Sequence, residues 1–163
     1  RIYLDNAATT PVRKEVVDAM LPYFTENFGN PSSVYQIAQM NKKAVDDARE
    51  TIANALGANA NEIFFTSGGS EADNWAIKGI AQAHKAKGNH IITTKVEHAS
   101  IIETMKYLED LDYDITYLNV DNFGKLNLIE LKEAIGEEGI KDLLRYIKEA
   151  IKKGIDDLIC LVI

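Results

Sequence analysis

The sequence predicts an α/β fold, in which helices pack against a sheet, because strand-like and helix-like segments alternate along the chain. Short runs rich in β-branched and aromatic residues occur at residues 62–66, 90–94 and 113–120. Around them, apolar residues recur at the three- and four-residue spacing of amphipathic helices. The chain has 163 residues and is 46% apolar, which is enough for one domain with a real core.

The N-terminal third is expected to be helical. Thr10 can cap a first helix and Pro11 can begin it, because the fixed φ of proline suits the first turn. The apolar face of this helix would consist of Val12, Val16, Val17, Met20 and Phe24. The Gly-Asn-Pro sequence at residues 29–31 breaks it, and a longer helix is expected over residues 33–56 with a solvated polar face and Gly57 as its stop.

The rest of the chain alternates regularly between strands and helices. The predicted segments are, in order, a strand at 62–66, a helix at 70–84, a strand at 90–94, a helix at 99–109, a strand at 113–120, a turn at 121–124 and a helix at 128–135.

Composition excludes several classes of protein. A formal net charge of -7 argues against a nucleic-acid partner, because such binding depends on Lys and Arg neutralising phosphates. No stretch approaches the roughly 20 apolar residues of a membrane helix, and no secretory signal is visible, so a cytoplasmic location is predicted. The single cysteine, Cys160, excludes an intramolecular disulfide framework, and the three histidines lack metal-ligand spacing.

Residues 66–74 combine a strand end, a glycine turn and a helix start. The unpaired N–H groups of a first helical turn, with the positive end of the helix dipole behind them, form an anion site suited to phosphate. Glycines permit close approach, and the Ser70 hydroxyl could add a donor. The alternative is an ordinary connection between a strand and a helix.

His98 is the second candidate, because it follows the strand-like run at residues 91–94, where open α/β sheets place ligand-binding groups. An imidazole there could transfer protons near neutral pH. The alternative is a helix-start histidine whose ring is satisfied by nearby backbone. His84 and His90 are interpreted as structural.

Four motifs occur together, at residues 4–11, 29–33, 66–74 and 96–100. With them the chain resembles, over about residues 2–135, the cysteine desulfurases of the aminotransferase class V group. These are pyridoxal-phosphate enzymes that convert cysteine to alanine and an enzyme persulfide, for iron–sulfur cluster and other sulfur-containing products. The resemblance implies a partial large domain of a fold-type I pyridoxal-phosphate enzyme, and the cofactor itself.

The resemblance also implies roles for individual residues. Gly69 and Ser70, where many members have Ala-Thr, would bind the cofactor phosphate, and His98 would stack on the pyridine ring and take part in proton transfers. The residues that would border the substrate pocket are Asn6, Ala7, Ala8 and Thr9. Tyr35 stands where many members carry a histidine, so no catalytic role is assigned to it.

Several family motifs are absent from this sequence. It has no Ser-x-His-Lys motif to supply a Schiff-base lysine, no motif with the aspartate that holds the pyridinium nitrogen, and no mobile loop with a nucleophilic cysteine. Lys95 belongs to a different motif, and Cys160 lies in an apolar run at residues 158–163 that is typical of a buried strand. This chain alone is therefore expected to be inactive.

The sequence leaves the family pattern after residue 135. We therefore divide it into a partial cofactor-binding domain at 1–135 and a segment at 136–163 with an amphipathic helix, about 140–154, and the apolar run. Three explanations are open: a truncated or engineered fragment, a discontinuous chain, or a natural short homologue. The first two are favoured, because an exposed apolar strand at the end of a natural chain risks aggregation.

Other functions stay open at this stage. The nearest enzymatic alternative is a selenocysteine lyase or another class V enzyme. A different class is a non-catalytic α/β scaffold that keeps a phosphate-binding turn, and a third is an interaction module that docks the helix at residues 140–154 on a partner. For the complete family member, the resemblance implies cysteine as substrate, a sulfur-acceptor protein and a homodimer.

Overall fold

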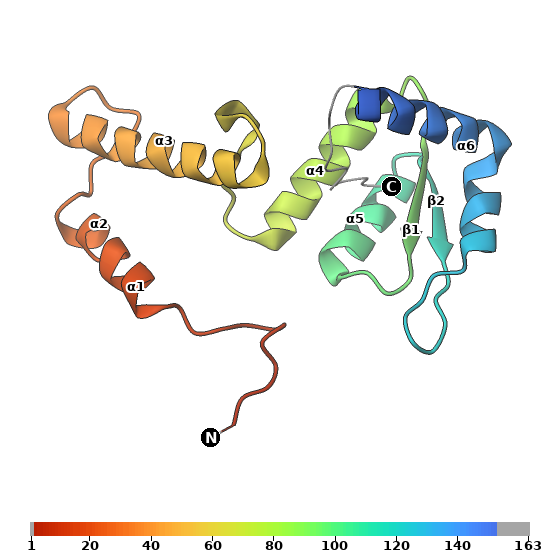
Figure 1. Cartoon of the computed structure of the whole chain (residues 1–163), viewed down its shortest axis with the longest axis horizontal. Helices are drawn as coiled ribbons and strands as arrows, with labels where there is room; N and C mark the ends of the chain where they lie inside the picture. Colours follow the sequence, from red (N-terminus) through yellow and green to blue (C-terminus); the bar gives the residue numbers. More distant parts are fainter. Residues whose placement is uncertain (1, 153–163) are drawn as a thin grey trace. The chain divides into compact units, whose positions relative to one another are not determined.

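A computed structural model describes residues 2–152, with side chains described to Glu137 and then only at residues 139–141 and 144. The chain forms two compact units, a first unit of Arg1–Phe65 and a second unit of Thr66–Ile163. Figure 1 shows the helices of the first unit and the two strands of the second. The predicted strand at 158–163, Cys160 and the last residues of the predicted helix at 140–154 lie outside the described residues.

The first unit begins with two short helices, α1 at Lys14–Met20 and α2 at Pro22–Thr25. The predicted start at Thr10 and Pro11 is wrong, because the first helical hydrogen bonds go to the carbonyl oxygen of Arg13. Short helices depend on packing for their stability, and the predicted apolar face is largely exposed among the described residues: Val12 is 62% exposed and Phe24 is 71% exposed. Pro22 separates the two helices because it has no N–H to donate.

The long helix α3 spans Gln36–Leu56. It begins later than residue 33 because Asn30 binds the turn before it, accepting from the Ser32 N–H through Oδ1 at 2.9 Å. Gly57 ends the helix in the left-handed conformation, with φ 66° and ψ 24°, so the predicted stop is confirmed.

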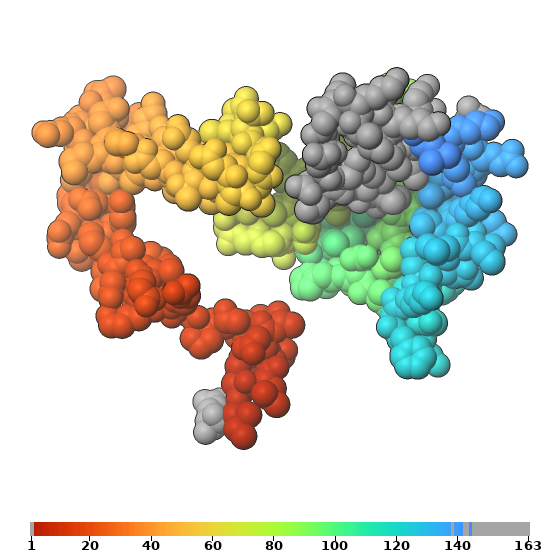
Figure 2. All heavy atoms as spheres, in the orientation of Figure 1, coloured from red at the N-terminus to blue at the C-terminus, as the bar shows by residue number. Residues whose placement is uncertain are grey.

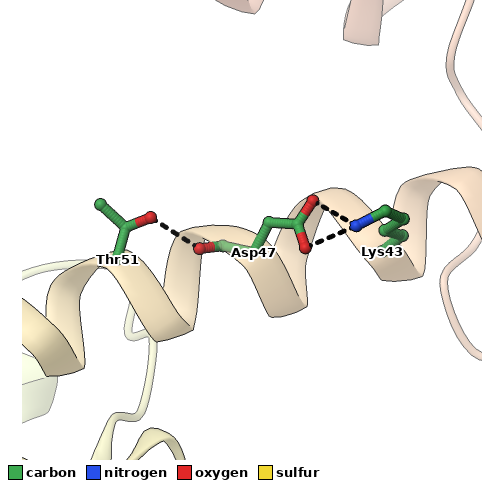
Figure 3. Close-up of polar contacts among 3 residues, drawn as sticks. All are labelled: Lys43, Asp47 and Thr51. Atoms are coloured by element: carbon green, nitrogen blue, oxygen red, sulfur yellow. Dashed lines mark hydrogen bonds and ion pairs between the residues drawn. The ribbon is translucent and has the colours of Figure 1, made fainter.

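One exposed face of α3 is polar, as expected. Lys43 Nζ lies 2.8 Å from both carboxylate oxygens of Asp47, one turn along the helix, and Thr51 Oγ1 donates to the Asp47 carbonyl oxygen (Figure 3). The hydrogen bond and charge of Asp47 raise the pKa of Lys43 above its usual value. Both side chains are largely solvated, so the pair adds little to stability.

The predicted strand at residues 62–66 is wrong. Ala60–Glu62 form a 3-10 turn, η1, and residues 63–65 follow in irregular backbone. The Ile63 carbonyl oxygen accepts from the Arg49 guanidinium of α3, which also lies 4.9 Å from the centre of the Phe65 ring. A strand requires a neighbouring backbone, and the described residues supply a side chain to this segment instead.

The second unit contains a parallel βαβ arrangement. Strands β1 at His90–Thr94 and β2 at Asp114–Leu118 pair in parallel, with His90 opposite Asp114 and Thr94 opposite Leu118. Helix α5, Ala99–Glu109, connects them, and α4, Gly69–His84, packs against α5 (Figure 1). The small core consists of Thr104, Met105, Leu108, Tyr113 and Leu118. The α/β fold class is confirmed here.

The predicted turn at residues 121–124 is confirmed and projects from the second unit, where its atoms are cyan in Figure 2. Asp121 Oδ1 accepts from the Phe123 and Lys125 N–H groups, and Gly124 has φ 78°. Helix α6 then spans Leu128–Lys152, with a kink where Gly136 has φ 73° and ψ 167°. The two helices expected after residue 127 therefore meet at this glycine. No helix among residues 2–152 is long and apolar enough to cross a membrane.

Candidate functional site

The start of α4 presents bare backbone amides. The first hydrogen bond of the helix runs from the Ala72 N–H to the Gly68 carbonyl oxygen, 3.1 Å, and no side chain caps the helix. The N–H groups of Gly69, Ser70 and Glu71 therefore have no acceptor among the described residues. A Cβ atom added at Gly69 would meet nothing within 4 Å, so the space beside these amides is open.

Hydrogen bonds within the turn hold it in place. Glu71 Oε2 accepts from the Ser67 N–H at 2.6 Å and from the Ser67 hydroxyl at 2.7 Å. The backbone bond and then the hydroxyl bond lower the pKa of the Glu71 carboxyl below its ordinary 4.5, since both favour the ionised form. Thr66 Oγ1 donates to the Gly68 carbonyl oxygen, and Asn74 Nδ2 donates to that of Ser70. The carbonyl oxygens are thus engaged while the first amides are not.

His98 lies at the start of α5, the neighbouring helix. It is the N-cap residue, with φ −60° and ψ 151°, and its Nδ1 accepts from the Ser100 N–H at 3.1 Å. The ring therefore caps the helix, which agrees with the alternative interpretation of His98 as a helix-start histidine bound to nearby backbone. It is exposed, and Nε2 has no hydrogen-bond partner among the described residues, so this second nitrogen is available for chemistry.

A hydrogen bond joins the two helix starts. Ser100 Oγ donates to Asp73 Oδ2 of α4 at 2.6 Å, and the same oxygen lies 2.8 Å from His98 Nδ1. Asp73 and Ser100 are both half-buried. The sequence analysis missed them, because each is an ordinary polar residue in a helix and only the packing of α4 on α5 brings them together.

The ends of the two strands are also tied by polar contacts. Thr94 Oγ1 donates to Glu97 Oε1 at 3.0 Å. Lys95 Nζ donates to Asn119 Oδ1 at 2.8 Å, and Asn119 Nδ2 donates to Glu130 Oε1 of α6 at 3.2 Å. Lys95 thus connects the residues that follow β1 and β2.

The predicted pocket-border residues belong to the first unit. Asn6, Ala7 and Ala8 form a turn, with the Ala8 N–H donating to the Asp5 carbonyl oxygen at 3.2 Å. The Tyr3 hydroxyl contacts the carbonyl oxygens of Asp5, 2.7 Å, and Thr9, 3.2 Å. All of these residues are exposed. Within the second unit, the Asp73–Ser100 hydrogen bond joins the helix that begins at Gly69 to the helix that His98 caps. The turn at residues 6–8 belongs to the first unit.

Comparison with known proteins identifies the family. The model of the family described as "Aminotransferase class-V" matches this sequence over residues 2–141. The chain belongs to the aminotransferase class V family. This confirms the resemblance inferred from the four motifs, and the match extends a few residues beyond the expected limit of residue 135.

The named relatives of this class V chain are cysteine desulfurases. It is 57% identical over 139 residues to "Cysteine desulfurase IscS" of Methanosarcina thermophila, covering 85% of this chain and 34% of that protein. It is also 57% identical over 140 residues to the protein of the same name from Clostridium botulinum (strain Hall), covering 86% and 35%. The chain thus spans about a third of the length of these relatives.

Solved structures agree with the fold. A chain titled "NIFS-LIKE PROTEIN" matches with a TM-score of 0.78 and 38% identity, over 84% of this chain and 38% of that one. A chain titled "SspA in complex with cysteine" matches with a TM-score of 0.75 and 40% identity, over 83% and 39%. A partial fold-type I domain is therefore confirmed.

The described residues fit the phosphate of pyridoxal phosphate. Open amides at Gly69 and Ser70, one hydroxyl and a helix dipole make a donor set for an anion, and the bare glycine leaves room for it. Among the described residues there is no group of three or more His, Cys, Asp or Glu side chains that could hold a metal ion.

Proposed function

We propose that this chain forms the N-terminal part of the cofactor-binding domain of a pyridoxal-phosphate-dependent cysteine desulfurase. The observation that carries the proposal is the juxtaposition within the second unit of an open amide turn at Gly69 and Ser70 with an exposed imidazole at His98. The Asp73–Ser100 hydrogen bond, 2.6 Å, joins the helices that carry them. The names of the relatives support the activity of the complete protein.

Gly69 and Ser70 would hold the cofactor phosphate. Their N–H groups and the Ser70 hydroxyl are donors, and the positive end of the α4 dipole adds favourable charge. When bound, pyridoxal phosphate supplies an electron sink for bond cleavage next to an amino group. A fixed phosphate would fix the position of the ring, which is the contribution expected from this part of the chain.

His98 would cover the ring and move protons. Its Nδ1 is engaged by Ser100, which fixes the orientation of the imidazole, and Nε2 is the nitrogen that could accept or deliver a proton. Asn6, Ala7, Ala8 and Thr9 are proposed to border the substrate pocket of the complete protein. We further propose cysteine as its substrate, a sulfur-acceptor protein as its partner, a homodimeric state and a cytoplasmic location.

A second candidate function is phosphate binding without turnover. The open amides at the start of α4 would support it without any further group. A selenocysteine lyase would use the same described residues, so the choice between the two enzymes depends on parts of the relatives that this chain does not cover.

The proposal is tested by NMR titration of the chain with pyridoxamine phosphate, which lacks the aldehyde and so cannot react with surface lysines. The amide signals of Gly69 and Ser70 should shift, and the His98 ring signals should shift with them. Pyridoxamine, which lacks the phosphate, is the matched control ligand and should leave the Gly69 and Ser70 amides unchanged. Equal shifts with both ligands, or none with either, would contradict a phosphate site at this turn.

A further inference from the structure

The hydroxyl of Ser100 has two acceptors and one proton. Its oxygen lies 2.6 Å from Asp73 Oδ2 and 2.8 Å from His98 Nδ1. The Ser100 N–H also points at Nδ1, over 3.1 Å. A hydroxyl donates once, so the three contacts cannot all be hydrogen bonds in one protonation state.

With a neutral imidazole that carries its proton on Nε2, Nδ1 is an acceptor. It receives the Ser100 N–H and can also receive the Ser100 hydroxyl proton, while the ring proton lies on Nε2. A hydroxyl that donates to Nδ1 in this state no longer donates to the Asp73 carboxylate.

With a protonated imidazole, the hydrogen bond between Nδ1 and the Ser100 hydroxyl reverses its direction. Nδ1–H donates to Ser100 Oγ, and the hydroxyl then donates to Asp73 Oδ2. The 2.6 Å separation is typical of a hydroxyl bound to a carboxylate, which is stronger than a bond between neutral groups. This arrangement connects the positive ring to a negative side chain through one intervening hydroxyl.

We propose that Ser100 and Asp73 are positioning residues for His98, and that the Ser100 hydroxyl changes partner as the ring gains and loses a proton. Asp73 stabilises the protonated ring through Ser100. The exchange would let His98 accept a proton without leaving its position at the start of α5. Its use in catalysis rests on the proposed function. The exchange itself belongs to the unliganded chain.

Other charged groups near this site have partners of their own. Glu97 accepts from Thr94, and Glu71 accepts from Ser67. On the facing helices, Lys78 of α4 lies 4.2 Å from the centre of the Tyr107 ring, and Glu103 and Lys106 of α5 form an ion pair at 2.7 Å. A substitution of Asp73 removes none of these contacts. A comparison of variants therefore measures the effect of the hydrogen bonds that connect Asp73, Ser100 and His98.

The test is an NMR pH titration of the His98 ring signals in the unliganded chain. Asp73→Asn should lower the proton affinity of His98 by about two- to fivefold, the range expected for a solvated charge interaction. In a Ser100→Ala background the same change should have less than half that effect, because the connecting hydroxyl is gone. Ser100→Thr keeps a hydroxyl and should restore the full effect of Asp73→Asn.

The matched control is Asp110→Asn, which removes the same charge at the other end of α5 and should leave His98 unchanged. If Asp73→Asn acts equally with and without the Ser100 hydroxyl, the carboxylate acts through space and the proposal is wrong. If Asp73→Asn unfolds the chain, the Ser100 variants test the proposal by themselves. Ser100→Ala should then lower the proton affinity of His98, and Ser100→Thr should leave it unchanged. Pyridoxamine phosphate is absent throughout, so failure of cofactor binding leaves the outcome intact.

Discussion

The Asn41 side chain donates a hydrogen bond from Nδ2 to the carbonyl oxygen of Gly29, over 2.6 Å. The same nitrogen donates to the Asn27 carbonyl oxygen over 2.7 Å. Asn41 is 7% exposed and is one of three buried residues of α3. The buried side-chain amide of Asn41 therefore attaches the segment before α3 to the helix. It does so through the carbonyl oxygens of Asn27 and of Gly29, the first residue of the Gly-Asn-Pro motif.

Asn41→Ala should loosen this attachment. It leaves two carbonyl oxygens without their donor, and a buried group that loses its partner costs about 1–3 kcal/mol. Native-state hydrogen exchange of the α3 amides measures the loss as faster exchange. Asn54→Ala, at an exposed asparagine of the same helix, is the matched control and should change the exchange rates little.

Gly29→Ala should destabilise the same region for a steric reason. An added Cβ would lie 2.8 Å from the Ile37 carbonyl carbon and 2.9 Å from the Ala38 nitrogen. Because both atoms are backbone at the start of α3, the helix has to shift, at a cost of about 1–3 kcal/mol. The measurement is again amide exchange in α3, with Gly88→Ala as control, because a Cβ there meets nothing within 4 Å. An unchanged α3 in Gly29→Ala would mean that the contact relaxes without cost.

The turn before α4 should loosen at acid pH. The Ser67 hydrogen bonds lower the pKa of Glu71 in the folded chain, so the unfolded chain binds a proton more readily. The stabilisation by Glu71 is therefore fully present above its ordinary 4.5 and is lost as the pH falls through the lower value of the folded state. The chemical shift of the Ser67 amide, followed from neutral pH downward, should report this loss.

Glu71→Gln is the control for that titration. The amide can still accept a hydrogen bond from Ser67 but does not ionise, so the acid transition of the Ser67 amide should disappear. A transition that persists in Glu71→Gln would have to come from another carboxylate.

Local patterns predicted the second unit well. The strand at residues 90–94 and the helix at residues 99–109 have the predicted bounds, since each carries its own periodicity and a clear start. Gly57 likewise ends α3, because the left-handed position is a local requirement that glycine meets best. Gly69, Ser70 and His98 stay predictions from motifs, and the structure adds the hydrogen bond that connects α4 with α5.

The failures arose where tertiary contacts decide. An apolar run such as residues 62–66 becomes a strand only beside another strand, and the sequence does not say which neighbour is present. The apolar residues of α1 were expected to pack, but Val16 and Met20 are 47% and 48% exposed. Asp73 and Ser100 are 27 residues apart, so no local pattern connects them.

Arg49→Lys should release the segment that was predicted as a strand. The Arg49 guanidinium donates to the Ile63 carbonyl oxygen while its Cζ atom lies 4.9 Å from the centre of the Phe65 ring. A lysine ammonium keeps the charge but has neither the planar fork nor the stacking surface, so we expect a loss of about 1 kcal/mol. Exchange of the amides at residues 63–65 should become about fivefold faster, with Arg13→Lys, at an exposed position, as control. If the rates stay equal, residues 63–65 are held by other contacts and Arg49 does not substitute for a strand partner.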